Sequence, residues 1–361
     1  MLRILRRDAL RDDSTIGGDE GRRGLVAARF DAKHDAHAAS PEQNGSLGHA
    51  PLMTDQPKLR LGTRQSPLAL AQANEARARL CAAHGWAESA VELVPVRASG
   101  DKIQDRPLAE IGGKALWTKE LDEWLAEGRI DGAVHSMKDV ETIRPAALAI
   151  AAVLPRADVR DVLVGASAIS RIPSGARVGT SAPRRAAQLL HHRPDCEVVM
   201  FRGNVATRLA KLAAGEADVT LLAAAGLERL GETGVGTPLD PDAWLPAPAQ
   251  GAIGIECRAG DDATRTLLAA IDDAPSRATV MAERVLLAAL GGNCHSPIAA
   301  HSAIRDGRIV LRASLFSPDG VERVEDDATF AVGDAEAPAR LAARLLARAT
   351  PGIAAHFDGP A

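Results

Sequence analysis

The sequence predicts an α/β fold of two domains, followed by a smaller α+β domain. Between residue 57 and about residue 260, short apolar runs alternate with amphipathic or Ala-rich stretches, as in α/β proteins. After about residue 261 the order changes to a helix, three strands and a last helix. The length of 361 residues is sufficient for two or three domains.

In the first part of the chain, strands and helices mostly alternate. Pro67 starts a helical run rich in Ala and Leu, and Leu121, Trp124 and Leu125 recur at helical spacing. The expected strands are 59–61, 91–96, 131–135, 148–154, 161–164, 177–179, 197–201 and 219–223. The expected helices are 67–84, 119–127, 184–191, 205–213 and 226–230. This alternation favours mainly parallel sheets.

The Pro-rich segment 240–248 indicates a linker or hinge, and a strand at 249–256 is expected to return to an earlier sheet. Pro275 precedes an expected helix at 276–289. The remaining expected elements are strands 298–304, 309–316 and 321–330 and helix 338–349. We therefore expect domain 1 at 57–155 with 249–270, domain 2 at 156–248, and domain 3 at 271–361.

Residues 1–56 differ from the rest because they contain 8 bases and 9 acids without a sustained period. A transit peptide would be poor in acids. We expect a disordered extension, or a misplaced start codon with Met53 as the true first residue.

Composition excludes several classes of protein. A net charge of -4 and the absence of Tyr argue against a nucleic-acid binder, and no charge-free apolar run is long enough for a membrane span. The four cysteines include no C-x-x-C pair, which argues against a structural zinc site, and no metal is expected. We expect a cytoplasmic protein with reduced thiols.

Four strand-to-helix turns carry basic or hydroxyl residues. They are Gly62-Thr-Arg-Gln-Ser66, His135-Ser-Met-Lys-Asp139, Gly179-Thr-Ser-Ala-Pro-Arg-Arg185 and Phe201-Arg-Gly-Asn-Val205, with Arg208 one turn further on. Ligands of open α/β sheets bind at this edge, next to helix N-termini. The turns therefore predict a cleft for an anion with several negative groups. Carboxylates are the better candidate, because Gly112-Gly-Lys114 lacks the spacing of a phosphate-binding loop.

Two further residues stand out. Asp139 is an acid in a turn otherwise rich in bases: it is either a helix N-cap or a carboxylate that transfers a proton or stabilises a cation. Cys294 lies in the loop Gly291-Gly-Asn-Cys-His295, where a thiol is a nucleophile or an attachment point more readily than a core residue. The neighbouring His295 could lower the pKa of this thiol. Cys257, directly after a strand, is expected to be buried.

These residues together give the chain from about 57 to 361 a resemblance to the porphobilinogen deaminase (hydroxymethylbilane synthase) family. The matching strings include Gly62-Thr-Arg-Gln-Ser66, Gly100-Asp101, Gly112-Gly-Lys114, Ala133-Val-His-Ser-Met-Lys-Asp-Val140, Gly179-Thr-Ser181, Arg184-Arg185, Arg202-Gly-Asn-Val-Ala-Thr-Arg208, Gln250-Gly-Ala-Ile-Gly254 and the Cys294 loop. They extend over the whole chain after residue 56.

The resemblance implies the head-to-tail condensation of four porphobilinogen molecules, with loss of ammonia, into the linear tetrapyrrole hydroxymethylbilane on the route to haem. It implies two domains like type-2 periplasmic binding proteins around a cleft, and a third domain whose Cys294 carries one dipyrromethane cofactor through a thioether. Asp139 matches the catalytic aspartate. The implied cofactor-binding residues are Lys138, Ser66, Thr180, Arg184, Arg185 and Asp101. The implied substrate-binding residues are Arg64, Arg202, Arg208, Lys114 and Gln250. A monomer is expected, with porphobilinogen and the growing pyrrole chain as its ligands.

Five positions depart from common family patterns: Glu110, Trp117, Ala182, Ala249 and Asn293. Ala182 removes a hydroxyl donor, and Ala249 replaces a Gly at an expected hinge. Two alternatives are weaker. A periplasmic solute-binding protein would need an export signal and gives no reason for the Cys294 loop, and an inactive paralogue is disfavoured by the presence of Lys138, Asp139 and Cys294.

Overall fold

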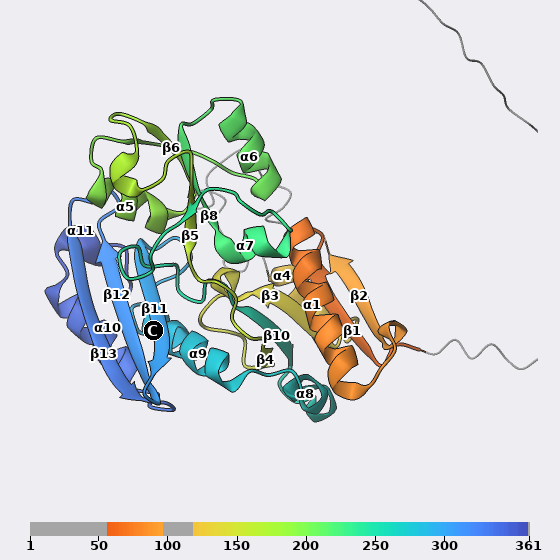
Figure 1. The fold of residues 1–361 in the computed structure, drawn as a ribbon. Coiled ribbons are helices and arrows are strands. Elements are labelled where there is room, and N and C mark those ends of the chain that lie inside the picture. Colours follow the sequence, from red (N-terminus) through yellow and green to blue (C-terminus); the bar gives the residue numbers. More distant parts are fainter. Residues whose placement is uncertain (1–55, 97–117, 360–361) are drawn as a thin grey trace, which may run out of the picture. The chain divides into compact units, whose positions relative to one another are not determined.

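The computed structural model describes residues 56–96 and 118–359, which form three sheets with flanking helices (Figure 1). Outside the described residues lie 1–55, which make up nearly all of the expected N-terminal extension. The same holds for four residues singled out from the sequence: Asp101, Glu110, Lys114 and Trp117.

The first sheet has the strand order β2-β1-β3-β10-β4. Its strands are β1 (Leu59–Arg64), β2 (Val91–Val96), β3 (Gly132–Ser136), β4 (Leu148–Val153) and β10 (Ile253–Arg258). The expected return of a late strand to an earlier sheet is confirmed, because β10 pairs with both β3 and β4. Its bounds differ from those expected, since residues 249–252 form a turn and the strand starts at Ile253.

The second sheet has the order β7-β6-β8-β5-β9. Its strands are β5 (Asp161–Val164), β6 (Arg177–Gly179), β7 (Glu197–Val199), β8 (Val219–Ala223) and β9 (Thr237–Pro238). The prediction of mainly parallel sheets is confirmed for strand direction, since four of the five strands in each of these two sheets run the same way, but it did not include the one reversed strand in each. In each of these two sheets one strand, β10 or β5, runs antiparallel to both of its neighbours, while the other pairs are parallel.

Helices cover these sheets at the bounds that the sequence mostly predicts. They are α1 (Pro67–His84), α4 (Lys119–Ala126), α5 (Pro183–His192), α6 (Val205–Ala213), α7 (Ala224–Arg229) and α8 (Asp262–Ala269). Helix α8 was not predicted. Helix α1 starts after Ser66, whose hydroxyl accepts the Ala69 N–H, and it ends at His84, where the following Gly85 has a φ of 65° that suits a glycine.

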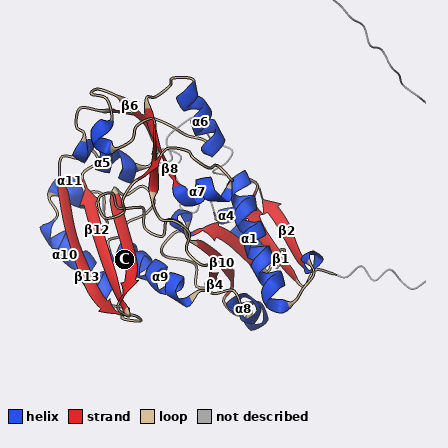
Figure 2. Cartoon of the chain, in the orientation of Figure 1, coloured by secondary structure: helices blue, strands red, loops and turns tan. Residues whose placement is uncertain are grey.

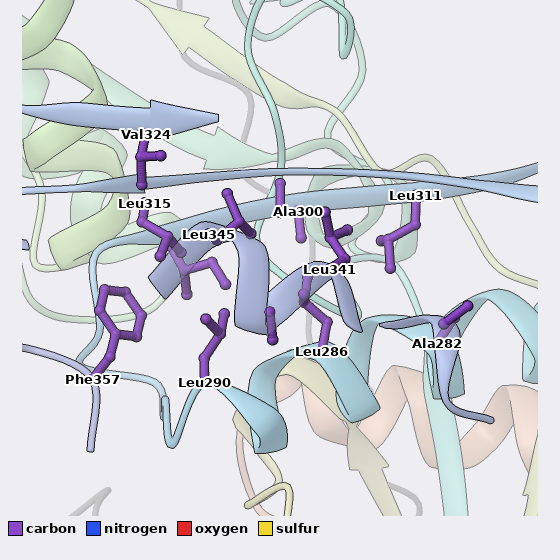
Figure 3. Close-up of a cluster of buried hydrophobic side chains, with 14 of the residues drawn as sticks. Ala282, Leu286, Leu290, Ala300, Leu311, Leu315, Val324, Leu341, Leu345 and Phe357 are labelled. Carbon is purple, nitrogen blue, oxygen red and sulfur yellow. The ribbon is translucent and has the colours of Figure 1, made fainter. Parts of the chain in front are cut away.

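The third sheet is an antiparallel meander of β11 (Ile298–Arg305), β12 (Arg308–Phe316) and β13 (Arg323–Ala331). It packs against α9 (Ala274–Ala289) and α10 (Ala337–Arg348), and the short α11 (Pro351–Ala354) follows (Figure 2). Figure 3 shows the core of this part, in which leucines of both helices meet strand residues such as Leu311 and Leu315.

Helix α9 also reaches the first sheet. Its Val280 is fully buried in a cluster with Met137, Val140, Val153 and Ala252. The same helix therefore packs on the third sheet and on the segment that follows β3, and it leads directly into the Cys294 loop.

Candidate active site

The Lys138–Asp139 turn directly follows β3. Residues Met137–Asp139 form one turn of 3-10 helix, anchored by the buried Met137, whose N–H donates to the Ala252 carbonyl over 3.0 Å. A side chain at Gly254 of the facing strand would overlap the Met137 thioether and force the buried Met137 to shift, so glycine fits this position best. Asp139 ends this turn and caps no helix, which excludes the N-cap interpretation of its carboxylate.

A small pocket of about 60 Å³ brings the first two predicted turns together. Arg64, Ser66 and Asp139 line it, with Gln72 and His135. The Ser66 hydroxyl is also the N-cap of α1, so the side chain lies at the positive end of a helix dipole. The expectation that the first two turns share one sheet edge is therefore confirmed.

A buried ionic network lies behind this pocket. Glu256 is fully buried on β10, where it accepts two hydrogen bonds from Arg144, of 2.9 and 2.8 Å, and lies 3.3 Å from His135 Nε2. Burial alone would raise the pKa of Glu256, but His135 and Arg144 lower it to about 2. Arg144 also pairs with Glu141, two residues after Asp139. The network ties the segment that follows the Lys138–Asp139 turn to the centre of the first sheet.

The third predicted turn places Arg184 and Arg185 in the first turn of α5, each about 5% exposed. Their guanidinium groups meet the same carboxylate, that of Asp161: Arg184 Nη2 lies 2.7 Å from Oδ2, and Arg185 Nη2 lies 2.7 Å from Oδ1. Burial alone would raise the pKa of Asp161, but the two arginines and the Trp244 hydrogen bond hold it far below its ordinary range. Sequence reasoning missed Asp161. The only available signal was an acid at the start of an otherwise apolar strand.

Lys138, Arg184, Arg185, Arg202 and Arg208 form what we call the basic cluster. Lys138 interacts electrostatically with Asp139, Arg184, Arg185 and Asp161. Arg208, on α6, interacts with Arg185, Arg202 and Asp139. The second, third and fourth predicted turns are thus brought together, although they come from two different sheets.

Among the described residues the cluster has five basic side chains, and the acids that act on its Lys138 and Arg208 are Asp139 and Asp161. Removal from water, reinforced by Arg185 and Arg184, lowers the pKa of Lys138 to about 8, against the opposing effect of Asp139 and Asp161. Removal from water and two neighbouring arginines lower the pKa of Arg208 to about 10. In both groups burial is the largest cause and neighbouring guanidinium groups add to it, and a bound polycarboxylate would favour the charged form of each.

The Cys294 loop follows α9 and is folded by local hydrogen bonds. The Asn293 amide oxygen accepts the His295 N–H over 2.8 Å, and the Asn293 N–H donates to Ser296 Oγ over 3.1 Å. Cys294 is an exposed free cysteine. Removal from water around the sulfur, and then the charges of Asp139 and Glu141, raise the pKa of its thiol to about 11. The suggestion that His295 lowers this pKa is wrong, because removal from water raises it most and the charges of Asp139 and Glu141 raise it further.

The loop is held in relation to Asp139 by α9. Arg284 of this helix donates to the Val140 carbonyl over 3.0 Å and to the Glu141 carbonyl over 2.7 Å. The helix that leads to Cys294 is thereby fixed to the backbone immediately after Asp139. Asp139 thus interacts with Lys138 from the first sheet, with Arg208 from α6, and with Cys294.

The other predicted residues have mainly buried positions. Thr180 is 2% exposed, and its hydroxyl accepts the Ala182 N–H over 3.2 Å. Gln250 is 1% exposed, and its Nε2 donates to Asp161 Oδ1 over 2.9 Å. Ala249 has a φ of 59°, which favours glycine. Cys257 is fully buried, as predicted.

The described residues contain no group of three or more His, Cys, Asp or Glu side chains placed to hold a metal ion. Within the same residues, none of the helices combines the length and apolarity needed to cross a membrane.

Comparison with known proteins decides the family. The family model described as porphobilinogen deaminase, dipyrromethane cofactor binding domain, matches residues 59–266, and that of the porphobilinogen deaminase C-terminal domain matches residues 277–348. The chain belongs to the porphobilinogen deaminase family. It is 58% identical over 312 residues to a porphobilinogen deaminase of Sphingopyxis alaskensis, a match that covers 85% of this chain and 98% of that protein. It is 53% identical over 270 residues to a porphobilinogen deaminase of Paracoccus denitrificans, covering 74% and 86%.

Membership of this family confirms the sequence-based expectation of an enzyme of tetrapyrrole biosynthesis that forms hydroxymethylbilane and has a dipyrromethane cofactor-binding domain. Among solved structures, the periplasmic VFT2 domain of BvgS from Bordetella pertussis is similar at 16% identity and a TM-score of 0.36, over 61% of this chain and 88% of that one.

Proposed function

We propose that Asp139 is the catalytic carboxylate of this hydroxymethylbilane synthase and that Cys294 is the attachment point of its cofactor. The observation that supports this best is the electrostatic interaction of Asp139 with three groups, Lys138, Arg208 and the Cys294 thiol. One carboxylate therefore faces both the basic cluster and the only exposed cysteine among the described residues.

The residues fit a dipyrromethane group. Two pyrrole rings with an acetate and a propionate each present four carboxylates, and the basic cluster offers five cationic side chains to bind them. The Nε atoms of Arg184 and Arg185 are buried and make no hydrogen bond within the described part of the chain. When bound, the cofactor supplies the electron-rich pyrrole carbon to which the first substrate molecule is joined.

The roles of the chain's own groups follow from charge. Loss of ammonia from porphobilinogen leaves a cationic carbon, and the Asp139 carboxylate stabilises positive charge that develops beside it. In this proposal the same carboxylate also accepts a proton as a new carbon–carbon bond forms. Lys138 and the arginines bind the carboxylates of the pyrroles, because guanidinium forks match carboxylates bidentately.

We assign Ser66, Lys138, Thr180, Arg184, Arg185 and Asp101 to cofactor binding. We assign Arg64, Arg202, Arg208, Lys114 and Gln250 to substrate binding. We also propose the domain boundaries given above, a monomeric state and a cytoplasmic location. The two buried residues Thr180 and Gln250 act through neighbours: Thr180 shapes the turn before α5, and Gln250 holds Asp161.

Intact mass spectrometry of the purified protein tests this proposal. We expect the chain mass plus two pyrrole units, and the loss of this addition in Cys294→Ser. Asp139→Asn should fold and carry the cofactor but lose nearly all turnover. An addition that survives Cys294→Ser would exclude the attachment site, and near wild-type turnover of Asp139→Asn would exclude the catalytic role.

Arg184→Leu tests the assignment of carboxylate binding. It should raise KM for porphobilinogen or stall elongation, so that intermediates with one to three added rings accumulate on the enzyme. An unchanged KM and an unchanged distribution of intermediates would contradict this assignment.

A further inference from the structure

Asp161 accepts hydrogen bonds from four side chains at the base of the basic cluster. Its Oδ2 accepts from Arg184 Nη2 over 2.7 Å and from Trp244 Nε1 over 2.8 Å. Its Oδ1 accepts from Arg185 Nη2 over 2.7 Å and from Gln250 Nε2 over 2.9 Å. A carboxylate has about four acceptor positions, so Asp161 is saturated, and it is fully buried.

The four donors come from separate segments. Arg184 and Arg185 start α5, Trp244 lies in the connection after the second sheet, and Gln250 lies in the turn before β10. Asp161 itself starts β5, directly after the chain has passed from the first sheet to the second. Both connections between these sheets therefore meet the arginine pair at this one carboxylate.

The remaining hydrogen bonds fix each guanidinium further. Arg184 Nη1 donates to the Leu245 carbonyl over 3.0 Å, and Arg185 Nη1 donates to the Leu221 carbonyl over 2.8 Å. With two nitrogens of each group held, neither arginine can rotate freely. What each leaves unused among the described residues is its buried Nε–H, as noted above.

We propose that Asp161 is a positioning residue that fixes Arg184 and Arg185 for the carboxylates of the cofactor and substrate, so that its negative charge raises the affinity for these anions. This inference rests on the proposed function. If only the charge of Asp161 mattered, it would lower the affinity for anions, because an acid inside a cationic site repels them. Neutralising Asp161 should therefore weaken anion binding if the residue positions the arginines, and strengthen it if the residue acts only by repulsion.

The matched control is Glu283. It is also fully buried, it pairs with both terminal nitrogens of Arg156 over 2.8 and 2.9 Å, and it accepts from the Ser302 hydroxyl over 2.8 Å. Its other hydrogen bonds come from the Ala249 N–H over 2.6 Å and the Ser302 N–H over 2.7 Å, and none of these partners belongs to the basic cluster. A general cost of losing a buried carboxylate should therefore appear equally in Glu283→Gln and Asp161→Asn.

The experiment compares wild type, Asp161→Asn and Glu283→Gln. Apo-protein is incubated with porphobilinogen, loading of Cys294 is followed by intact mass, and KM for porphobilinogen and thermal stability are measured on the loaded enzymes. We expect both variants to lose stability. Only Asp161→Asn should attach the cofactor to Cys294 more slowly. Only this variant should also raise KM, by at least about tenfold, which corresponds to the loss of one charge-assisted hydrogen bond.

The pH dependence of KM is a second readout. Lys138 faces Asp139 on its own turn, Arg184 and Arg185 on α5, and Asp161 on β5. Loss of the Asp161 charge should lower the pKa of Lys138, so the rise of KM at alkaline pH should begin at a lower pH in Asp161→Asn. Glu283→Gln should keep the wild-type profile.

A folded Asp161→Asn with unchanged or lower KM and unchanged loading would overturn the inference. If Asp161→Asn does not fold, Trp244→Phe decides, because it removes one donor to Asp161 without changing any charge: KM should rise about threefold, and an unchanged KM would overturn the inference. A wild-type protein that gains no mass from porphobilinogen would instead refute the proposed function.

Discussion

The raised pKa of Cys294 predicts an unreactive thiol in the apo-protein. A shift from the ordinary value of 9.0 to about 11 reduces the thiolate fraction at pH 8 by about 100-fold. The remaining thiolate is more nucleophilic, by about 6- to 10-fold for a Brønsted coefficient of 0.4–0.5. Alkylation should therefore be about 10- to 15-fold slower than that of an unperturbed thiol.

The assay is the rate of iodoacetamide addition at Cys294 as a function of pH, followed by peptide mass spectrometry on apo-protein from cells that make no porphobilinogen. Asp139→Asn should accelerate the reaction severalfold below pH 9, because removing a neighbouring negative charge lowers the pKa of the thiol. Glu141→Gln should give a smaller acceleration, since Asp139 has the larger effect. A wild-type midpoint at or below pH 9, or an Asp139→Asn rate equal to wild type, would refute the reasoning.

Three further predictions concern pH and stability. KM for porphobilinogen should rise above about pH 8, because Lys138 then loses the proton that attracts carboxylates. The variant Lys138→Arg should remove this rise. A flat KM from pH 7 to 9.5 in wild type would contradict the prediction. Ala182→Ser should stabilise the protein by about 1 kcal/mol, because Ala182 is the N-cap of α5 and its side chain makes no capping hydrogen bond. Calorimetry should show a Tm about 2 °C higher. An unchanged Tm would mean that the hydroxyl does not reach the helix N–H groups. Leu286→Ala should cost about 3 kcal/mol in urea unfolding, because Leu286 is fully buried between α9, α10 and the third sheet; a loss below 1 kcal/mol would show that the core closes around the cavity.

Much of the fold was predictable because local signals were strong. Ser66 and Pro67 mark the start of α1, and Gly85 lies just beyond its end, so the bounds of this helix were correct. The start of α8 has an N-cap residue as well, since Asp261 accepts the Thr264 N–H. A helix of eight residues, however, is too short for its apolar spacing to be recognised in the sequence.

Strand direction was not predictable from local pattern. An apolar run such as β10 has the same composition whether it runs parallel or antiparallel to its neighbours, and its direction is set by where the connections enter the sheet.

The candidate site shows a similar division. The sequence placed Asp139 beside Arg64 and Ser66 because the ends of neighbouring parallel strands share one edge. It could not identify Asp161 as the partner of Arg184 and Arg185, because this contact joins the start of one strand to a helix that begins more than twenty residues later. Ion pairs of this kind follow from tertiary packing, not from sequence spacing.

The position of β10 also affects the order in which the chain can fold during synthesis. The second sheet uses only residues between 161 and 238, so all of its strands leave the ribosome before β10 does. The first sheet begins earlier, but β10, which lies between β3 and β4, is complete only at residue 258. That is roughly 100 residues after the end of β4. At 5–20 residues per second, β3 and β4 wait about 5–20 s with exposed edges. This interval is when the nascent chain most needs a chaperone to cover those strands.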